Sequence, residues 1–270
     1  MAIKFAIALL LPAAVLLAQP DKTAWDVLKQ GFDDRNPDRR RQAVTATASI
    51  GLAPDAVKLV EQALQDKDPL VRQTAAAELG QMKSKQSAEA LKTALDDVSG
   101  EVAFAAAKAL WDMGDKDGRG LIEDVVTGQQ RASDGTASGA RKTRDPKALA
   151  AMGFKEASGA LLGPFNIGIL AAEQAFKDSS AGGRALAVTL LARDCDAETE
   201  RILERTCTDD KSWVVKAAAA KALGQCGNQD AIPKLELSLS DSHDAVKFMA
   251  AASIIRLSLK PGGPADRPDR

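Results

Sequence analysis

A two-part helical motif recurs along this chain roughly every 31 residues, and a repeat of that length predicts an array of small stacked units. The first part of each copy places apolar residues at i, i+3 and i+7, which form one stripe of an amphipathic helix. Five copies carry it: Trp25/Leu28/Phe32, Val57/Val60/Leu64, Ala88/Leu91/Leu95, Ile169/Ala172/Phe176 and Ile232/Leu235/Leu239. Each unit is therefore expected to begin with a helix that buries one face.

The second part of each copy predicts a second helix. It places an apolar or small residue, an alanine and an aliphatic residue at four-residue spacing, and the central alanine allows close packing on a neighbouring helix. Its copies are Val71/Ala75/Leu79, Val102/Ala106/Leu110, Gly183/Ala187/Leu191, Val215/Ala219/Leu223 and Val246/Ala250/Ile254. The repeated unit is thus a pair of helices.

Charged residues mark the link between the two helices. An aspartate closes the first helix, and in most copies a basic residue follows six places later. The pairs are Asp34/Arg40, Asp66/Arg72, Asp178/Arg184, Asp210/Lys216 and Asp241/Lys247, whereas Asp97 is followed by Ala103. We expect the carboxylate near the free N–H groups of the second helix and the basic side chains in a ladder between repeats. Exposed ion pairs contribute about 0–1 kcal/mol each, so this ladder is interpreted as structural rather than as a binding strip.

Two segments show the motif most fully, DPLVRQTAAAELG at 68–80 and KSWVVKAAAAKALG at 211–224. They resemble HEAT repeats and are similar to the short HEAT-like repeats of phycobiliprotein lyase subunits. The resemblance covers most of residues 22–258. It implies an all-α fold, an α-solenoid of about seven HEAT-like helical hairpins with an irregular insertion in the middle, whose second helices line a concave surface. The expected units span 23–51, 54–82, 85–114, 116–152, 165–194, 197–225 and 229–258.

The two ends of the chain are expected to lie outside the repeat domain. Residues 1–18 have a cationic start at Lys4, an apolar run and a small residue at Ala18, which is typical of a secretory signal peptide. Cleavage near Ala18 predicts an exported protein, periplasmic or secreted. Residues 19–258 then form the HEAT-like domain, and 259–270 are expected to be a disordered tail.

An insertion at about 129–164 interrupts the repeats. Its first part, 129–144, is polar and locally basic, and we interpret it as a solvated loop. A neighbouring stretch, 157–172, has no charge and contains Gly159, Gly163 and Gly168. It is too short to span a bilayer, so a buried helix–turn–helix is favoured over membrane contact.

Composition argues against several kinds of chemistry. The formal net charge of −1 provides no field for drawing in nucleic acid, and no nucleic-acid partner is expected. The single histidine, His243, opens the last second helix, where a polar residue at a helix start is the expected role. Metal sites and catalytic triads need several convergent partners. We therefore expect no catalytic, metal-binding or cofactor-binding residues, and we predict that the protein is not an enzyme.

The three cysteines are expected to be free thiols. Cys207 falls close to the position of core leucines in other repeats and is interpreted as a small core residue. Cys195 and Cys226 end successive second helices, and stacked helices lie about 8–10 Å apart, whereas a disulfide needs Cα atoms within about 7 Å.

These features together predict a protein–protein interaction scaffold of the cell envelope or secreted space, with an unknown protein partner. The alternatives are an adaptor at the membrane surface that uses residues 157–172 and a bilin-lyase-like enzyme. The candidate contacts are placed at outward positions of the second helices, since aromatic, Met and Arg side chains are enriched at protein contacts. They are Phe104, Lys108, Lys221, Phe248, Met249 and Arg256.

Overall fold

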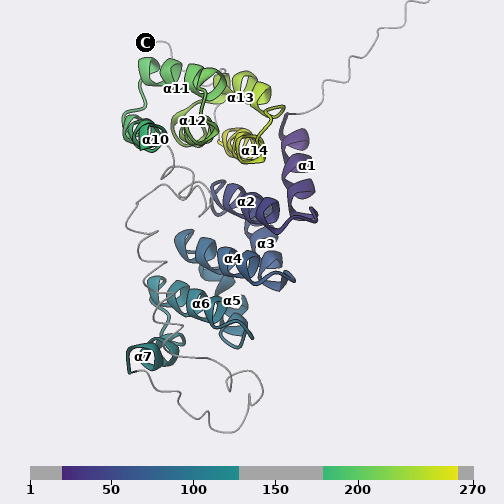
Figure 1. The fold of residues 1–270 in the computed structure, drawn as a ribbon, viewed down its shortest axis with the longest axis vertical. Helices are drawn as coiled ribbons and strands as arrows, with labels where there is room; N and C mark the ends of the chain where they lie inside the picture. Colours follow the sequence, from purple (N-terminus) through teal and green to yellow (C-terminus); the bar gives the residue numbers. More distant parts are fainter. Residues whose placement is uncertain (1–19, 128–178, 261–270) are drawn as a thin grey trace, which may run out of the picture.

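The computed structural model describes residues 20–127 and 179–260, and within these two ranges every regular element is a helix (Figure 1). The predicted all-α repeat fold is confirmed. The expected signal peptide, the insertion at 129–164, the apolar stretch at 157–172 and the expected first helix of the fifth unit lie outside the described residues. Of the expected tail, only Leu259 and Lys260 are described, and Lys260 donates hydrogen bonds to the carbonyls of Gln225 and Gly227.

The helices form two blocks in the sequence. The N-terminal block contains α1 (Pro20–Phe32), α2 (Pro37–Ala48), α3 (Pro54–Gln62), α4 (Pro69–Gln81), α5 (Ala88–Ala94), α6 (Gly100–Asp112) and α7 (Arg119–Thr127). The C-terminal block contains α10 (Ser179–Leu191), α11 (Ala197–Asp209), α12 (Trp213–Cys226), α13 (Ile232–Ser238) and α14 (Asp244–Ser258). Short 3₁₀ turns cover Ala63–Gln65, Lys85–Ser87 and Gln229–Ala231.

The repeated aspartate shapes the turn between the helices of a pair. Its side chain accepts the backbone N–H two residues on, which is an Asx turn. Asp66 accepts from Asp68 at 2.8 Å, and Asp241 accepts from His243 at 2.8 Å. The equivalent bonds join Asp34 to Asn36, Asp97 to Ser99 and Asp210 to Ser212. The predicted position of the carboxylates beside the second helices is confirmed.

The basic residue of one repeat reaches the aspartate of the next, so the predicted ladder is present. Arg40 donates from Nε and Nη2 to the two carboxylate oxygens of Asp66, at 2.7 and 2.8 Å. Its Nη1 also donates to the Asp34 and Arg35 carbonyls, which closes its own turn. The other rungs are Arg72–Asp97, Arg184–Asp210 and Lys216–Asp241. Some rungs are buried rather than exposed as expected, since the Arg40 side chain is only 5% exposed.

The order of the repeats in space differs from their order in the chain. Helix α14, the last in the sequence, packs against α1 and α2, the first two (Figure 1). A single core cluster joins Ala24, Leu28 and Ala43 of the first repeat to residues of the C-terminal block such as Phe248 and Ile255. The second helices therefore follow one another as α10, α12, α14, α2, α4 and α6.

The contact between α14 and the first repeat, here called the seam, is both apolar and polar. The Phe248 ring packs over Gly31 of α1, where an added Cβ would lie 2.7 Å from the ring and 2.7 Å from Ala43 Cβ. Arg39 is paired with Asp34 of its own repeat and with Asp244 of α14, each at 2.7 Å. Arg39 therefore carries the charged ladder across the seam.

Helix α10 packs in a different register from the one predicted. The predicted buried residues Gly183, Ala187 and Leu191 are all exposed. The face that α10 turns toward α12 carries Ala181, Ala185 and Val188 instead. The expected first helix of the same unit lies outside the described residues.

The seam provides a direct test of the packing. Replacing Gly31 with alanine should lower the free energy of unfolding by about 1–3 kcal/mol, because the added methyl would force the buried Ala43 and Phe248 side chains to shift. The matched variant is Gly183→Ala in α10, where no atom lies within 4 Å of the added Cβ. It should gain about 0.5–1 kcal/mol from the better helix propensity of alanine. Urea denaturation measures both, and equal effects would contradict the close approach at the seam.

The ladder is tested by Arg40→Ala, which we expect to cost about 3 kcal/mol because it leaves the Asp66 carboxylate without its partner. Lys108→Ala is the control, since its pair with Asp112 is exposed and should be worth about 0.5 kcal/mol or less. A cost for Arg40→Ala no larger than that of Lys108→Ala in urea denaturation would show that the rung is not stabilising.

The Arg40 rung also predicts a dependence on pH. Burial alone would raise the pKa of Asp66, but hydrogen bonds from Arg40 and the Asp68 backbone bring it below the ordinary 3.8. A depressed carboxyl pKa stabilises the fold above the unfolded value, and this contribution is lost as the pH falls through the folded value. Arg40→Ala should therefore show a smaller loss of stability between about pH 5 and pH 2 than the parent.

Candidate protein-binding surface

The second helices line the inner side of the curved array (Figure 1). They pack in one continuous layer that runs from α10 through α12, α14, α2 and α4 to α6, while α11, α13, α1, α3 and α5 lie outside it. Because the two blocks meet side by side at the seam, this inner surface contains residues from both halves of the chain.

Two of the predicted contact residues, Phe104 and Lys108, lie one turn apart on α6. Phe104 is half-buried and Lys108 is exposed. Lys108 Nζ donates to Asp112 at 2.6 Å within the same helix, in a pair exposed on both sides. Such a pair is weak, so the ammonium group can exchange its partner at little cost. Both residues are therefore available at the α6 end of the layer.

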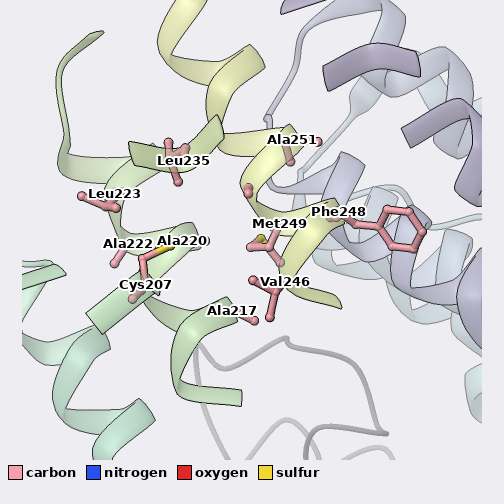
Figure 2. Close-up of a cluster of buried hydrophobic side chains, with 14 of the residues drawn as sticks. Cys207, Ala217, Ala220, Ala222, Leu223, Leu235, Val246, Phe248, Met249 and Ala251 are labelled. Atoms are coloured by element: carbon pink, nitrogen blue, oxygen red, sulfur yellow. The ribbon is translucent and has the colours of Figure 1, made fainter. Parts of the chain in front are cut away.

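Phe248 and Met249 are not available for binding, and their prediction as outward residues is wrong. They are 4% and 3% exposed. Figure 2 shows Phe248 pointing away from the C-terminal helices toward the N-terminal block. Met249 Sδ lies 3.5 Å from Ser49 Oγ at the end of α2. The error has a physical cause, since these residues would face outward only if the last repeat in the sequence were the last in space.

Arg256 also takes part in the seam, although it keeps a partly exposed side chain. Its Nη1 donates to the carbonyls of Ser49 and Ile50 at 3.0 and 3.3 Å. These carbonyls follow the last turn of α2, where a cation is favoured by the helix dipole. Within the described residues, its buried Nε has no hydrogen-bond acceptor. Arg256 thus joins α14 to the end of α2 across the seam through its Nη1 atom.

Lys221 lies on α12 within electrostatic reach of two other repeats. The pKa of its ammonium group is lowered, mainly because the group is buried. The nearby Arg256 guanidinium of α14 lowers this pKa as well, whereas the Glu78 carboxylate of α4 partly offsets the effect. Glu78 itself is 6% exposed. Lys221, Arg256 and Glu78, which we call the central charged cluster, therefore interact electrostatically across α12, α14 and α4. Sequence reasoning missed Glu78 because its position in the repeat carries uncharged residues elsewhere, namely Ala109, Leu190, Ala222 and Ser253.

The remaining polar residues singled out by the sequence have structural surroundings. His243 precedes α14, and its ring stacks on Trp213 with centroids 5.9 Å apart. Cys207 is 1% exposed, and its Sγ lies 3.2 Å from Ser238 Oγ. Among residues 20–127 and 179–260 there is no group of three or more His, Cys, Asp or Glu placed to hold a metal ion. In the same ranges, no helix is long and apolar enough to cross a membrane.

Comparison with known proteins agrees with the repeat architecture. The model of the HEAT repeats family matches residues 25–124 and 170–255, which is more than half of the chain. The protein therefore belongs to the HEAT-repeat family. No curated protein matches the chain.

Several solved structures resemble the chain at low similarity. Human deoxyhypusine hydroxylase in complex with glycerol shares 17% identity at a TM-score of 0.33, covering 89% of this chain and 98% of that one. An engineered protein shares 18% identity at a TM-score of 0.28, with 86% and 96% covered. A designed armadillo repeat protein shares 18% identity at 0.26, with 86% and 98% covered. Similarity at this level carries no argument about function.

The reassignment of Phe248 from contact residue to core residue can be tested by truncation. Phe248→Ala should destabilise the protein by about 3–5 kcal/mol, because the cavity opens inside the seam. Phe104→Ala, at the half-buried position of α6, should cost about 1 kcal/mol. Thermal unfolding of the two variants measures the difference. Similar unfolding midpoints would contradict the assignment of Phe248 to the core.

Proposed function

We propose that this protein is a non-catalytic scaffold that binds a protein partner on the inner layer of second helices, in the cell envelope or secreted space. The observation that carries the proposal is the continuity of that layer across the seam. HEAT and armadillo-like repeats present extended concave surfaces of this kind, and interaction is their general use. The fold alone does not name a partner, so the argument rests on the residues that the layer presents.

Those residues have the properties of a contact surface. Phe104 provides a half-buried aromatic side chain, and Lys108 and Lys221 provide cations on separate helices. Lys221 is already partly desolvated, so a partner carboxylate that pairs with it would displace little further water. A partner with acidic groups spaced along an elongated surface would complement the layer between α12 and α6.

A non-catalytic role is part of the proposal. The chain contains one histidine, and it lies beside Trp213 rather than in the central charged cluster. Export is proposed from the features of residues 1–18, so the partner is expected in the envelope or outside the cell. Neither the membrane-surface adaptor nor the bilin-lyase-like enzyme is proposed, because no observation in the described residues favours them.

The proposal is tested by placing a photo-cross-linking amino acid at position 108 on α6, in the full chain produced in its own cells. Position 58, an exposed lysine on the outer helix α3, is the matched control. We expect a discrete cross-linked partner at position 108 and none at position 58. Cross-linking at both positions alike, or at neither, would contradict binding on the inner layer.

A second variant asks whether the two blocks act as one surface. Lys221→Ala, on α12 of the other block, should reduce the yield of the product formed at position 108 by about fivefold to tenfold, as a contact worth more than 1 kcal/mol would. Lys58→Ala should leave the yield unchanged. An unchanged yield with Lys221→Ala would restrict binding to the N-terminal block.

A further inference from the structure

Cys195 and Cys226 come from two helices that end side by side. Cys195 lies four residues beyond the end of α10, and Cys226 is the last residue of α12. Helices α10 and α12 pack directly on one another, and both Ala192 and Cys226 pack against the same core cluster. Cys195 Sγ donates to the Ala192 carbonyl at 3.3 Å, which holds its side chain at the end of α10.

The segments that follow the two helices also meet, because Glu200 Oε1 in the first turn of α11 accepts the backbone N–H of Asn228, two residues beyond Cys226, at 3.3 Å. The Cys195 thiol is among the groups that raise the pKa of the Cys226 thiol. The separation of the α10 and α12 axes does not set the distance between these two cysteines, because Cys195 lies beyond its helix in the loop that leads to α11. A residue in a loop can approach a neighbouring helix more closely than a helix axis can. Both residues are free thiols in this structure, Cys195 exposed and Cys226 partly buried.

We propose that Cys195 and Cys226 form a reversible disulfide that fastens α10 to α12 at one end of the array. The side-by-side ends of α10 and α12 bring the two cysteines near each other, and the exposure of Cys195 gives a soluble disulfide access to the pair. The third cysteine is excluded from the exchange, since Cys207 is 1% exposed and contacts Ser238.

The bridge forms by two exchange steps with a low-molecular-weight disulfide such as oxidised glutathione. The Cys195 thiol loses its proton and attacks one sulfur of the oxidant, whose sulfur–sulfur bond breaks and releases one glutathione. The Cys226 thiol then loses its proton and attacks Cys195 Sγ, which releases the second glutathione. Two protein thiols are oxidised, and one oxidised glutathione is reduced to two thiols.

The surroundings of Cys226 favour this order. Burial raises the pKa of the Cys226 thiol, and the neighbouring Cys195 thiol raises it further. Because the thiolate is the nucleophile, Cys226 is less reactive than Cys195 in the first step. Once Cys195 is a mixed disulfide, it no longer carries a proton or a competing negative charge. Lys260, whose charge favours the thiolate of Cys226, remains beside it and donates to the Gln225 and Gly227 carbonyls.

The bridge would matter most for α10. Among the described residues α10 packs mainly on α12, and one side of it exposes Leu186, Leu190 and Leu191. A covalent link between the two helix ends closes the chain between residues 195 and 226 and removes conformations from the unfolded ensemble. The oxidising compartment proposed for the protein is the setting in which such links persist.

The experiment uses the full chain, purified with reductant, desalted and treated with oxidised glutathione. We expect the number of titratable thiols under denaturing conditions to fall from three to one, with the loss of two hydrogen atoms in the intact mass. Peptide mapping should find the peptides of Cys195 and Cys226 joined. A stable glutathione adduct on Cys195 without bridging, a bridge that includes Cys207, or no reaction would each overturn the proposal.

Single variants sharpen this result. Cys226→Ser should stop at a glutathione adduct on Cys195, and Cys195→Ser should react far more slowly. Cys207→Ser should form the bridge as the parent does. The oxidised parent should unfold at a temperature roughly 5–10 °C above the reduced parent, whereas Cys226→Ser should show no such gain. A lower midpoint for the bridged form would mean that the link strains the array and would also overturn the proposal.

Discussion

The packing of α14 on α1 and α2 is the contact on which the rest of the architecture depends. It converts two separate stacks of helices into one array, in which one core cluster joins the C-terminal block to the first repeat and a second cluster continues from α2 to α6. The contact is specific because it uses shape and charge together. The Phe248 ring fills the space that Gly31 leaves, and Arg39 joins Asp34 to Asp244. Without the seam, the inner layer would be two short surfaces instead of one.

Local features of the array could be predicted from the sequence because each depends on neighbours a few residues away. The spacing of Val57, Val60 and Leu64 predicts a buried helix face, and all three are buried. The position of Asp66 predicts a turn, and its carboxylate accepts the Asp68 N–H. The ladder also follows from this spacing. Arg72 donates to the Asp97 carboxylate of the following repeat and to the backbone carbonyl of Asp66 in its own repeat.

The global order of the repeats could not be predicted in this way. Every repeat offers nearly the same faces to its neighbours, so the sequence does not say that the seventh unit should meet the first. Phe248 and Met249 were misassigned for that reason. The central charged cluster also depends on this order, since Lys221, Arg256 and Glu78 approach one another only when the two blocks are joined.

The seam changes where such an array can come apart. A linear repeat protein unravels from its two outer units, and in most arrays these units carry the chain termini. Here the first and last described helices, α1 and α14, lie in the interior of the stack, and the outer members among the described helices are α7 and α10. Both outer helices adjoin the same internal stretch of sequence, 128–178. Within the described part of the chain, α1 or α14 can therefore be peeled away only by opening the middle of the array.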